Sequence, residues 1–281
     1  MTLDTRPDAV GWVENRPTVG LTRLPDLREL VAHRRIAWYL ALRDIQLRYK
    51  QTLLGAGWTI IKPLLGVGLF TVIFGDLLGV PSDGKPYAVF VFAGLLGWTY
   101  FSGSLANAST SLLVNAPMVS KIYFPRLLAP LSGVLPGLLD FLVGLPVLAA
   151  VMAINGVAPT WALVTVPIWL VLLAVLAFGL GCLLGAVMVT YRDVEHGLPY
   201  LLQLGLFATP IVYPSSLPTG TLAWVFHLNP VVAPIDGLRW ALIGSDTLGV
   251  QDLLSLGIGA VLATVGVLYF CRAEPRFADV I

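Results

Sequence analysis

The chain has 281 residues, of which 57% are apolar and only 12% are charged, about half of the roughly 25% that is usual in soluble domains. A mean hydropathy of +0.84 implies more apolar surface than one water-surrounded core could hide, so we expect lipid to cover the rest. The net charge of +1 excludes a strongly basic nucleic-acid binder and an acidic disordered tail. The sequence therefore predicts an all-α integral membrane protein.

The N-terminal region is predicted in two parts. Residues 1–50 contain nine of the 17 basic residues, and prolines interrupt the first half of this region, so residues 1–25 are expected to form a flexible cytoplasmic tail. In residues 26–52 apolar side chains recur at helical spacing and predict an amphipathic helix. Arg34 falls inside the apolar stripe, so it either snorkels or marks a break. The helix could pack on the protein itself or lie along the inner leaflet. The stripe consists of Leu27, Val31, Trp38, Leu42, Ile45 and Tyr49.

A helix that crosses the hydrocarbon core of a membrane needs about 20 charge-poor residues. Asn155, Gly156 and Pro159 divide one long charge-free interval into two of them. We expect a transmembrane domain over residues 53–274 and a short cytoplasmic tail over 275–281. The six predicted spans are about 57–78, 87–111, 127–154, 161–190, 196–213 and 253–271.

Residues 214–250 are too long for a tight turn and too apolar for a solvated loop. The stretches 223–228 and 231–243 could each form a short helix, but neither could span the membrane. Pro218, Pro230 and Pro234 break the segment. Short helices at membrane depth must pack against protein or line a cavity. We therefore expect two re-entrant half-helices before the last span.

Basic residues near span ends predict the orientation. With six spans and the N-terminus inside, only Lys85 and Arg239 of the 17 basic residues fall on the outer side. The sequence thus predicts a multi-pass protein of a bacterial plasma (inner) membrane with both termini in the cytoplasm.

Several kinds of site are missing from the sequence. No lysine lies in a GxxxxGK[ST] phosphate loop, so we expect no ATP binding by this chain. His33, His196 and His227 are scattered without paired carboxylates, which argues against metal or nucleophilic catalysis. Cys182 and Cys271 lie in apolar runs and are expected to be small core residues. We predict no catalytic, cofactor or metal site.

Asp140 is the one acidic residue predicted at mid-span. It could carry a proton in a secondary transporter, but a structural role is the more favoured interpretation. No internal repeat of the kind found in many secondary transporters is visible. A proton-coupled transporter is therefore the less favoured alternative.

An ordered set of motifs carries a family resemblance. It begins with Arg43-Asp-Ile-Gln-Leu-Arg-Tyr-Lys-Gln-Thr-Leu-Leu-Gly55, Trp58 and Lys62-Pro63, and continues through Phe92-Ala-Gly94, Trp98, Asn115-Ala-Pro-Met-Val-Ser-Lys-Ile-Tyr-Phe-Pro-Arg126, Tyr191-Arg-Asp193, Pro210-Ile-Val-Tyr-Pro214 and Leu228-Asn-Pro230. This set resembles the membrane subunit of ABC-2 type exporters, in particular those of O-antigen, teichoic acid and related lipid-linked polysaccharides. Export of another lipid or a drug by the same architecture stays an alternative.

The resemblance implies a homodimer of this subunit with two copies of a soluble ABC ATPase, which would bind ATP and Mg. It also implies that the first cytoplasmic loop docks into that ATPase, and an apolar face flanked by prolines fits this role. The matching positions are Asn115, Pro117, Met118, Lys121, Ile122, Tyr123, Phe124, Pro125 and Arg126.

A polysaccharide substrate needs flat apolar surfaces against sugar rings and cations against the lipid diphosphate. Aromatic residues also gather at every membrane interface, and cations also bind anionic lipid. The aromatic residues and the cations named below therefore each have a simpler explanation that involves no substrate. The predicted channel aromatics are Phe70, Phe74, Tyr87, Phe90, Phe207 and Tyr213. The predicted diphosphate-binding cations at the cytoplasmic mouth are Arg43, Arg48 and Lys50.

Two GxxxG pairs permit close helix contacts. Gly133 and Gly137 lie on the predicted third span, and Gly181 and Gly185 lie on the fourth. Spacing alone does not decide whether they pack within one chain or at a dimer seam.

Overall fold

The protein is helical throughout the part that the structure describes. The computed structural model describes residues 27–50, 57–119, 124–245 and 248–280, and within these ranges it contains helices and turns but no strand. This confirms the all-α prediction. The predicted tail, residues 1–25, lies outside the described residues. The helices are α1 (Leu27–Ala32), α2 (Arg34–Tyr49), α3 (Gly57–Phe70), η1 (Thr71–Leu77), α4 (Tyr87–Val114), α5 (Ala116–Val119), α6 (Leu128–Val134), α7 (Pro136–Ile154), η2 (Trp161–Thr165), α8 (Val166–Thr190), α9 (Asp193–Ala208), α10 (Thr221–Phe226), α11 (Val232–Ile243) and α12 (Asp252–Val280).

Among the described residues, five stretches are long and apolar enough to cross a membrane. The predicted span 196–213 is not among them, because α9 has only 16 residues and is about 24 Å long at 1.5 Å per residue. The helix stops where Thr209 takes an extended conformation, as expected of a residue that precedes a proline. The five stretches are Gly57–Leu77, Tyr87–Val114, Leu128–Ile154, Trp161–Thr190 and Asp252–Pro275.

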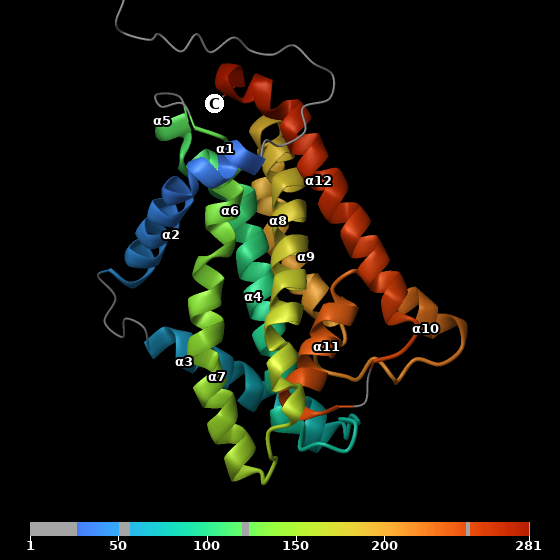
Figure 1. Cartoon of the computed structure of the whole chain (residues 1–281). Helices are drawn as coiled ribbons and strands as arrows, with labels where there is room; N and C mark the ends of the chain where they lie inside the picture. The colour runs from blue at the N-terminus through green and yellow to red at the C-terminus, as the bar shows by residue number, and fades with distance from the viewer. Residues whose placement is uncertain (1–26, 51–56, 120–123, 246–247, 281) are drawn as a thin grey trace, which may run out of the picture.

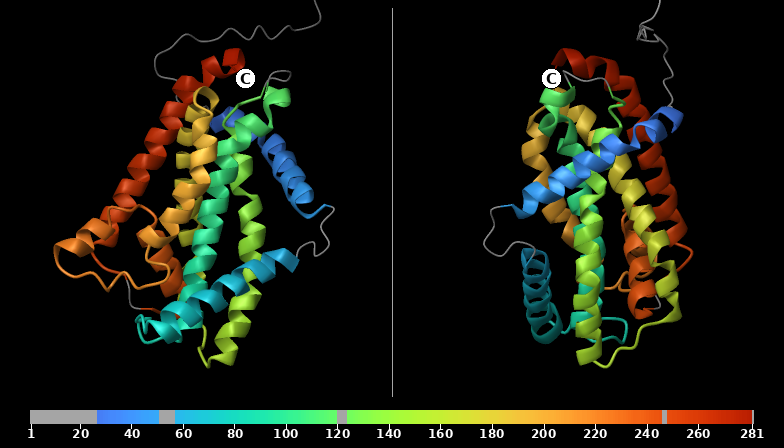
Figure 2. Two further views of the ribbon diagram at one scale, coloured as in Figure 1. Left: turned by 180° about the vertical axis from the view of Figure 1, so that it is seen from behind. Right: turned by 60° about the vertical axis from the view of Figure 1, so that its left-hand side comes forward.

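Helix α4 forms the centre of the bundle (Figures 1 and 2). It packs along α8 and also contacts α6, α7 and α11. Its apolar residues surround the whole helix, which is the pattern of a buried helix. By contrast, α3 and the π-helical η1 cross the outside of the bundle obliquely (Figure 2) and bury few of their side chains.

The two ends of the bundle differ. Helices α1 and α5 and the C-terminal end of α12 lie at one end, which we call the terminal end (Figure 1). The turns at 78–86 and 155–160 and the C-terminal end of α11 lie at the opposite, far end.

The predicted amphipathic helix is divided at His33 into α1 and α2, beside the residue that interrupts the apolar stripe. The face of α2 that packs on the protein consists of the small or aliphatic residues Ala37, Leu40 and Ala41, which are at most 5% exposed. The stripe residues Val31 and Trp38 are instead more than half exposed. Of the two placements that the sequence left open for the stripe, packing on the protein does not apply to these two side chains. The small alanines instead allow α2 to approach α6 closely.

The GxxxG glycines pack within this one chain. A methyl group at Gly133 would lie 2.6 Å from the backbone nitrogen of Ala108, and one at Gly181 would lie 2.5 Å from the Ala108 side chain. A methyl group at Gly185 would lie 3.0 Å from the Ser109 carbonyl oxygen. Helices α6 and α8 thus approach α4 closely because these positions carry no side chain. This answers the question that their spacing left open.

Candidate functional site

The predicted ATPase-docking segment lies at the terminal end. Helix α4 ends at Asn115, whose side-chain nitrogen donates a 2.7 Å hydrogen bond to the Ser111 carbonyl oxygen. Helix α5 follows, with Pro117 exposed and Met118 half-buried. Lys121, Ile122 and Tyr123 lie outside the described residues.

The C-terminal part of this segment is anchored in the protein. Phe124 is 3% exposed and belongs to a core cluster with Leu112 of α4 and Phe270 of α12. Pro125 is also buried, and the guanidinium of Arg126 donates to the backbone carbonyl of Glu274. Phe124 therefore fixes the segment to the bundle and is not exposed to a partner.

The predicted diphosphate-binding cations lie in the second half of α2. Arg43 is half-exposed and forms an ion pair of 2.7 Å with its neighbour Asp44. Lys50 is exposed at the end of the helix, and the Arg48 side chain lies outside the described residues. Asp44 therefore offsets the charge of Arg43, and Lys50 is open to solvent.

The structure brings the predicted channel aromatics together towards the far end. Phe70 lies 5.9 Å from Phe74 and 6.4 Å from Phe207, measured between ring centroids. The Tyr213 hydroxyl donates a 2.8 Å hydrogen bond to the Phe207 carbonyl. Phe70 and Phe74 come from the consecutive helices α3 and η1, and Phe207 and Tyr213 come from α9 and the turn after it, more than 130 residues later. We call Phe70, Phe74 and Phe207 the aromatic belt.

Tyr87 and Phe90 join this region from α4, with their ring centroids 6.3 Å apart. The Tyr87 hydroxyl donates a 2.5 Å hydrogen bond to the Val212 carbonyl. Phe90 is completely buried, and the guanidinium carbon of Arg239 lies 3.9 Å from its ring centroid. Phe90 thus supports a buried cation, whereas Phe207 is 48% exposed.

Sequence analysis missed a buried polar cluster on α11. Arg239 is fully buried and donates to the Asp236 carboxylate at 3.1 Å and to the Pro210 carbonyl at 2.8 Å. Asp236 is fully buried as well. The only trace in the sequence is an acid and a base three residues apart in the apolar stretch 231–243, a spacing that places them on one side of a helix. The charge pattern of the sequence places Arg239 only among the basic residues on the outer side of the membrane.

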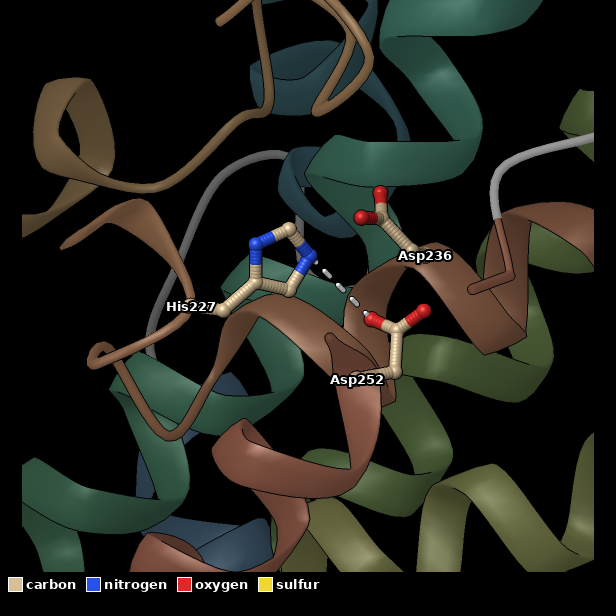
Figure 3. A group of neighbouring side chains, drawn as sticks. All are labelled: His227, Asp236 and Asp252. Atoms are coloured by element: carbon tan, nitrogen blue, oxygen red, sulfur yellow. Dashed lines mark ion pairs between the residues drawn. The ribbon is translucent and has the colours of Figure 1, made fainter. Parts of the chain in front are cut away.

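His227 and Asp252 lie beside Asp236 (Figure 3). His227 Nε2 is 3.5 Å from Asp252 Oδ1, and both residues are at most 5% exposed. His227, Asp236 and Asp252 each offer a ligand atom, and these atoms all lie within 4.8 Å of one another. The prediction that the histidines lack paired carboxylates was therefore wrong for His227. His227 directly follows α10, Asp236 lies in α11 and Asp252 begins α12, so their spacing in the sequence gave no signal.

Further hydrogen bonds hold the broken helices of the far end together. The Asn229 side chain donates to Thr209 at 2.9 Å. Ser255 donates to the Asn229 carbonyl at 2.8 Å and accepts from the Ala233 backbone nitrogen at 3.2 Å. Irregular backbone at membrane depth needs such partners because lipid supplies none. The turn after α9, α10, α11 and the start of α12 thus form one connected unit.

Comparison with known families identifies the domain. The sequence profile of the ABC-2 type transporter family matches residues 36–243. The chain belongs to this family. The match begins in α2 and ends with α11, so it includes the docking segment, the aromatic belt and the Asp236–Arg239 pair.

Individual ABC-2 relatives are similar over most of their length. An O-antigen export system permease protein RfbA of Klebsiella pneumoniae is 30% identical over 242 residues, which are 85% of this chain and 92% of the relative. An RfbA protein of Myxococcus xanthus is 30% identical over 209 residues, 74% of this chain and 80% of the relative. The polysialic acid transport protein KpsM of Escherichia coli is 26% identical over 237 residues, 79% of this chain and 90% of the relative.

Family membership confirms two sequence predictions. The chain is a multi-pass membrane permease subunit, and the ABC-2 membrane domain has no catalytic ATPase domain. An ABC-2 permease implies a partner ABC ATPase. The choice between an ATP-driven and a proton-coupled transporter, which Asp140 had left open, is thereby decided in favour of the ATP-driven class.

Proposed function

We propose that this permease exports a lipid-linked polysaccharide, such as an O-antigen-like surface glycan, from the cytoplasmic to the outer side of a bacterial inner membrane. The observation that carries the proposal is the similarity to O-antigen export permeases over 85% of the chain. A permease for polysialic acid is also similar, over 79% of the chain. The names of these relatives thus refer to two polysaccharides, O-antigen and polysialic acid.

The geometry of the far end supports a glycan as cargo. Sugar rings bind to aromatic faces, and the aromatic belt brings three phenylalanines from three helical elements to one place. A polymer that slides needs several weak contacts of similar strength and no single deep pocket. The partial exposure of Phe207 fits such a contact.

The active unit is expected to be a homodimer of this chain with two copies of a soluble ABC ATPase that binds ATP and Mg. Residues 115–126 are the proposed docking segment, in which α5 would contact the ATPase and Phe124 holds the segment to the bundle. In this assembly the anchor at Phe124 and Arg126 transmits the motion of the ATPase to α4 and α12.

The terminal end faces the cytoplasm in this proposal, and the far end faces outwards. Among the far-end basic residues, Arg239 is buried and ion-paired, so it adds no free positive charge to the outer surface. That strengthens the charge asymmetry that predicts orientation. The orientation requires a sixth crossing, which α9 and the turn to Tyr213 make together, and it leaves α10 and α11 as re-entrant half-helices. Lys50 and Arg43 then lie on α2 at the inner leaflet, where a lipid diphosphate would approach.

Deletion of the gene in its host bacterium tests this function. The lipid-linked glycan should accumulate inside the cell and disappear from the surface, and a plasmid copy of the gene should restore it. A plasmid copy with Gly257→Ala, at a position where an added methyl group meets nothing within 4 Å, serves as the control. Unchanged surface glycan in the deletion strain would contradict the proposal.

A further inference from the structure

The cluster of His227, Asp236 and Asp252 has the composition of a transition-metal site. One imidazole and two carboxylates are ligands that Zn²⁺ uses, whereas Mg²⁺ and Ca²⁺ prefer oxygen ligands alone. The three ligand atoms lie within 4.8 Å of one another. We propose that this cluster binds one Zn²⁺-like divalent cation, which joins α10, α11 and α12.

The hydrogen bonding of His227 matches that of a metal ligand. Its Nδ1 lies 2.7 Å from the Ala223 carbonyl oxygen, and a carbonyl can only accept, so Nδ1 carries the proton. In the neutral ring, Nε2 then presents a lone pair towards Asp252. Metal-binding histidines commonly have this arrangement, with the second nitrogen fixed by a backbone carbonyl.

The distance between His227 and Asp252 favours a metal ion over a proton between them. A charge-assisted N–H···O bond would be about 2.7–2.9 Å long, but Nε2 and Oδ1 are 3.5 Å apart. Two ligands that each lie about 2.0–2.1 Å from a tetrahedral zinc ion are about 3.4 Å apart. The separation of this one pair is thus close to that of two zinc ligands. The whole group lies within 4.8 Å, a looser arrangement that a bound ion would have to tighten.

Asp252 provides a second and independent observation. It is 5% exposed, and its Oδ2 accepts a 2.7 Å hydrogen bond from the Gly249 backbone. Its Oδ1 accepts no hydrogen bond from any residue that the structure describes, although it faces His227 (Figure 3). A buried carboxylate oxygen without a donor is unfavourable by about 1–3 kcal/mol, and a cation would satisfy it.

Asp236 can serve as the third ligand while it stays paired with Arg239. An ionised carboxylate has two oxygens and about four lone-pair sites. Arg239 uses one of these sites through Oδ1 and also holds the Asp236 side chain in place. In the ionised form that metal ligation requires, the two carboxylates and the one guanidinium, together with a neutral histidine, carry one excess negative charge, which a divalent cation offsets.

Zinc binding to the purified full-length permease tests the proposal. After removal of metal with EDTA and titration with ZnCl₂ alone, we expect one zinc per chain by elemental analysis and a thermal midpoint that rises with zinc concentration. His227→Ala and Asp252→Asn should lose both effects. His33→Ala and His196→Ala, which change histidines on α2's N-terminal side and on α9, should keep them.

Cobalt provides a readout that does not depend on comparing stabilities. Co²⁺ bound to the wild-type protein should give tetrahedral d–d absorption bands, and His227→Cys should add a thiolate-to-cobalt charge-transfer band. The wild-type protein contains Cys182 and Cys271, both buried, and is the control for that band. Equal zinc binding by the wild type and His227→Ala would overturn the proposal. So would a wild-type protein that binds less than one zinc per two chains. The proposal concerns the fold of the far end and does not depend on the identity of the cargo.

Discussion

The guanidinium of Arg239 and the carboxylate of Asp236 form a 3.1 Å ion pair in which both side chains are completely buried. Arg239 also donates to the carbonyls of Pro210 and Ile211 and lies over the Phe90 ring. One side chain thus connects α11, the turn after α9 and the central helix α4. Its burial means that this connection is sensitive to the loss of either charge.

Removal of one member of this pair should be more harmful than removal of both. Arg239→Met leaves a buried carboxylate without its cation and should lower stability by about 3–5 kcal/mol. The double variant Arg239→Met with Asp236→Leu should recover a large part of that loss, because no unpaired charge remains. Thermal unfolding of the purified permease in EDTA measures both. A double variant that is less stable than Arg239→Met would contradict this account.

The glycine at the α4–α6 contact should not tolerate a methyl group. Gly133→Ala places that group 2.6 Å from a backbone nitrogen that cannot move aside, and overpacking of this kind is unfavourable by about 1–3 kcal/mol. Gly257→Ala on α12 is the matched control, and there alanine should stabilise the helix by roughly 0.5–1 kcal/mol. Thermal midpoints in the same detergent compare the two. Equal midpoints would show that α6 does not contact α4 as described.

The two parts of the docking segment should respond differently to mutation. Phe124→Ala removes a buried ring and should lower the stability of the permease alone by about 3–5 kcal/mol. Lys121→Glu should leave that stability unchanged and slow association with the ATPase, since charges at the edge of an interface act mainly on the encounter rate. Thermal unfolding and surface plasmon resonance with the purified ATPase separate the two effects. Normal binding kinetics of Lys121→Glu would place the docking site elsewhere.

The aromatic belt should matter collectively. Each single replacement of Phe70, Phe74 or Phe207 by alanine should have a mild effect, and the triple variant should lower the export rate about tenfold, which corresponds to roughly 1.4 kcal/mol of lost interaction. A control triple variant removes three exposed aromatics outside the belt, at Trp161, Trp224 and Tyr269. Export is measured as surface glycan after equalising the amount of assembled complex. Normal export by the belt variant would exclude it from the substrate path.

The sequence predicted the structure correctly where a local property, such as a long charge-free stretch, determines it. Long charge-free stretches predicted the membrane-spanning helices, among them α4 and α8, because a helix that crosses lipid requires this composition over many residues. The break beside Arg34 is one of the two alternatives that a charge inside the stripe predicted, the other being a snorkelling side chain. The sequence did not indicate which face of α2 contacts the bundle, because that depends on how closely Ala37 and Ala41 approach α6.

The polar cluster of the far end illustrates the opposite case. His227, Asp236 and Asp252 come from three helices, and only the tertiary fold brings them within reach of one another. In the sequence each is one polar residue among apolar neighbours. The closeness of Phe70 to Phe207 likewise depends on the oblique course of α3, which no periodicity in the sequence indicates. Phe124 shows a third limit, since an aromatic residue in a short loop can face either a partner or the protein's own core.

ATP-dependent movement of the glycan across a membrane tests the proposed export most directly. The permease and its ATPase are reconstituted in vesicles with the ATPase side outwards, and a diphosphate-linked glycolipid from the host is supplied on that side. On addition of ATP and Mg²⁺, the glycan should become protected from an external glycosidase, while vesicles with the ATPase alone should show no protection. If the complex hydrolyses ATP and the glycan stays fully accessible to the glycosidase, this permease does not export lipid-linked polysaccharide.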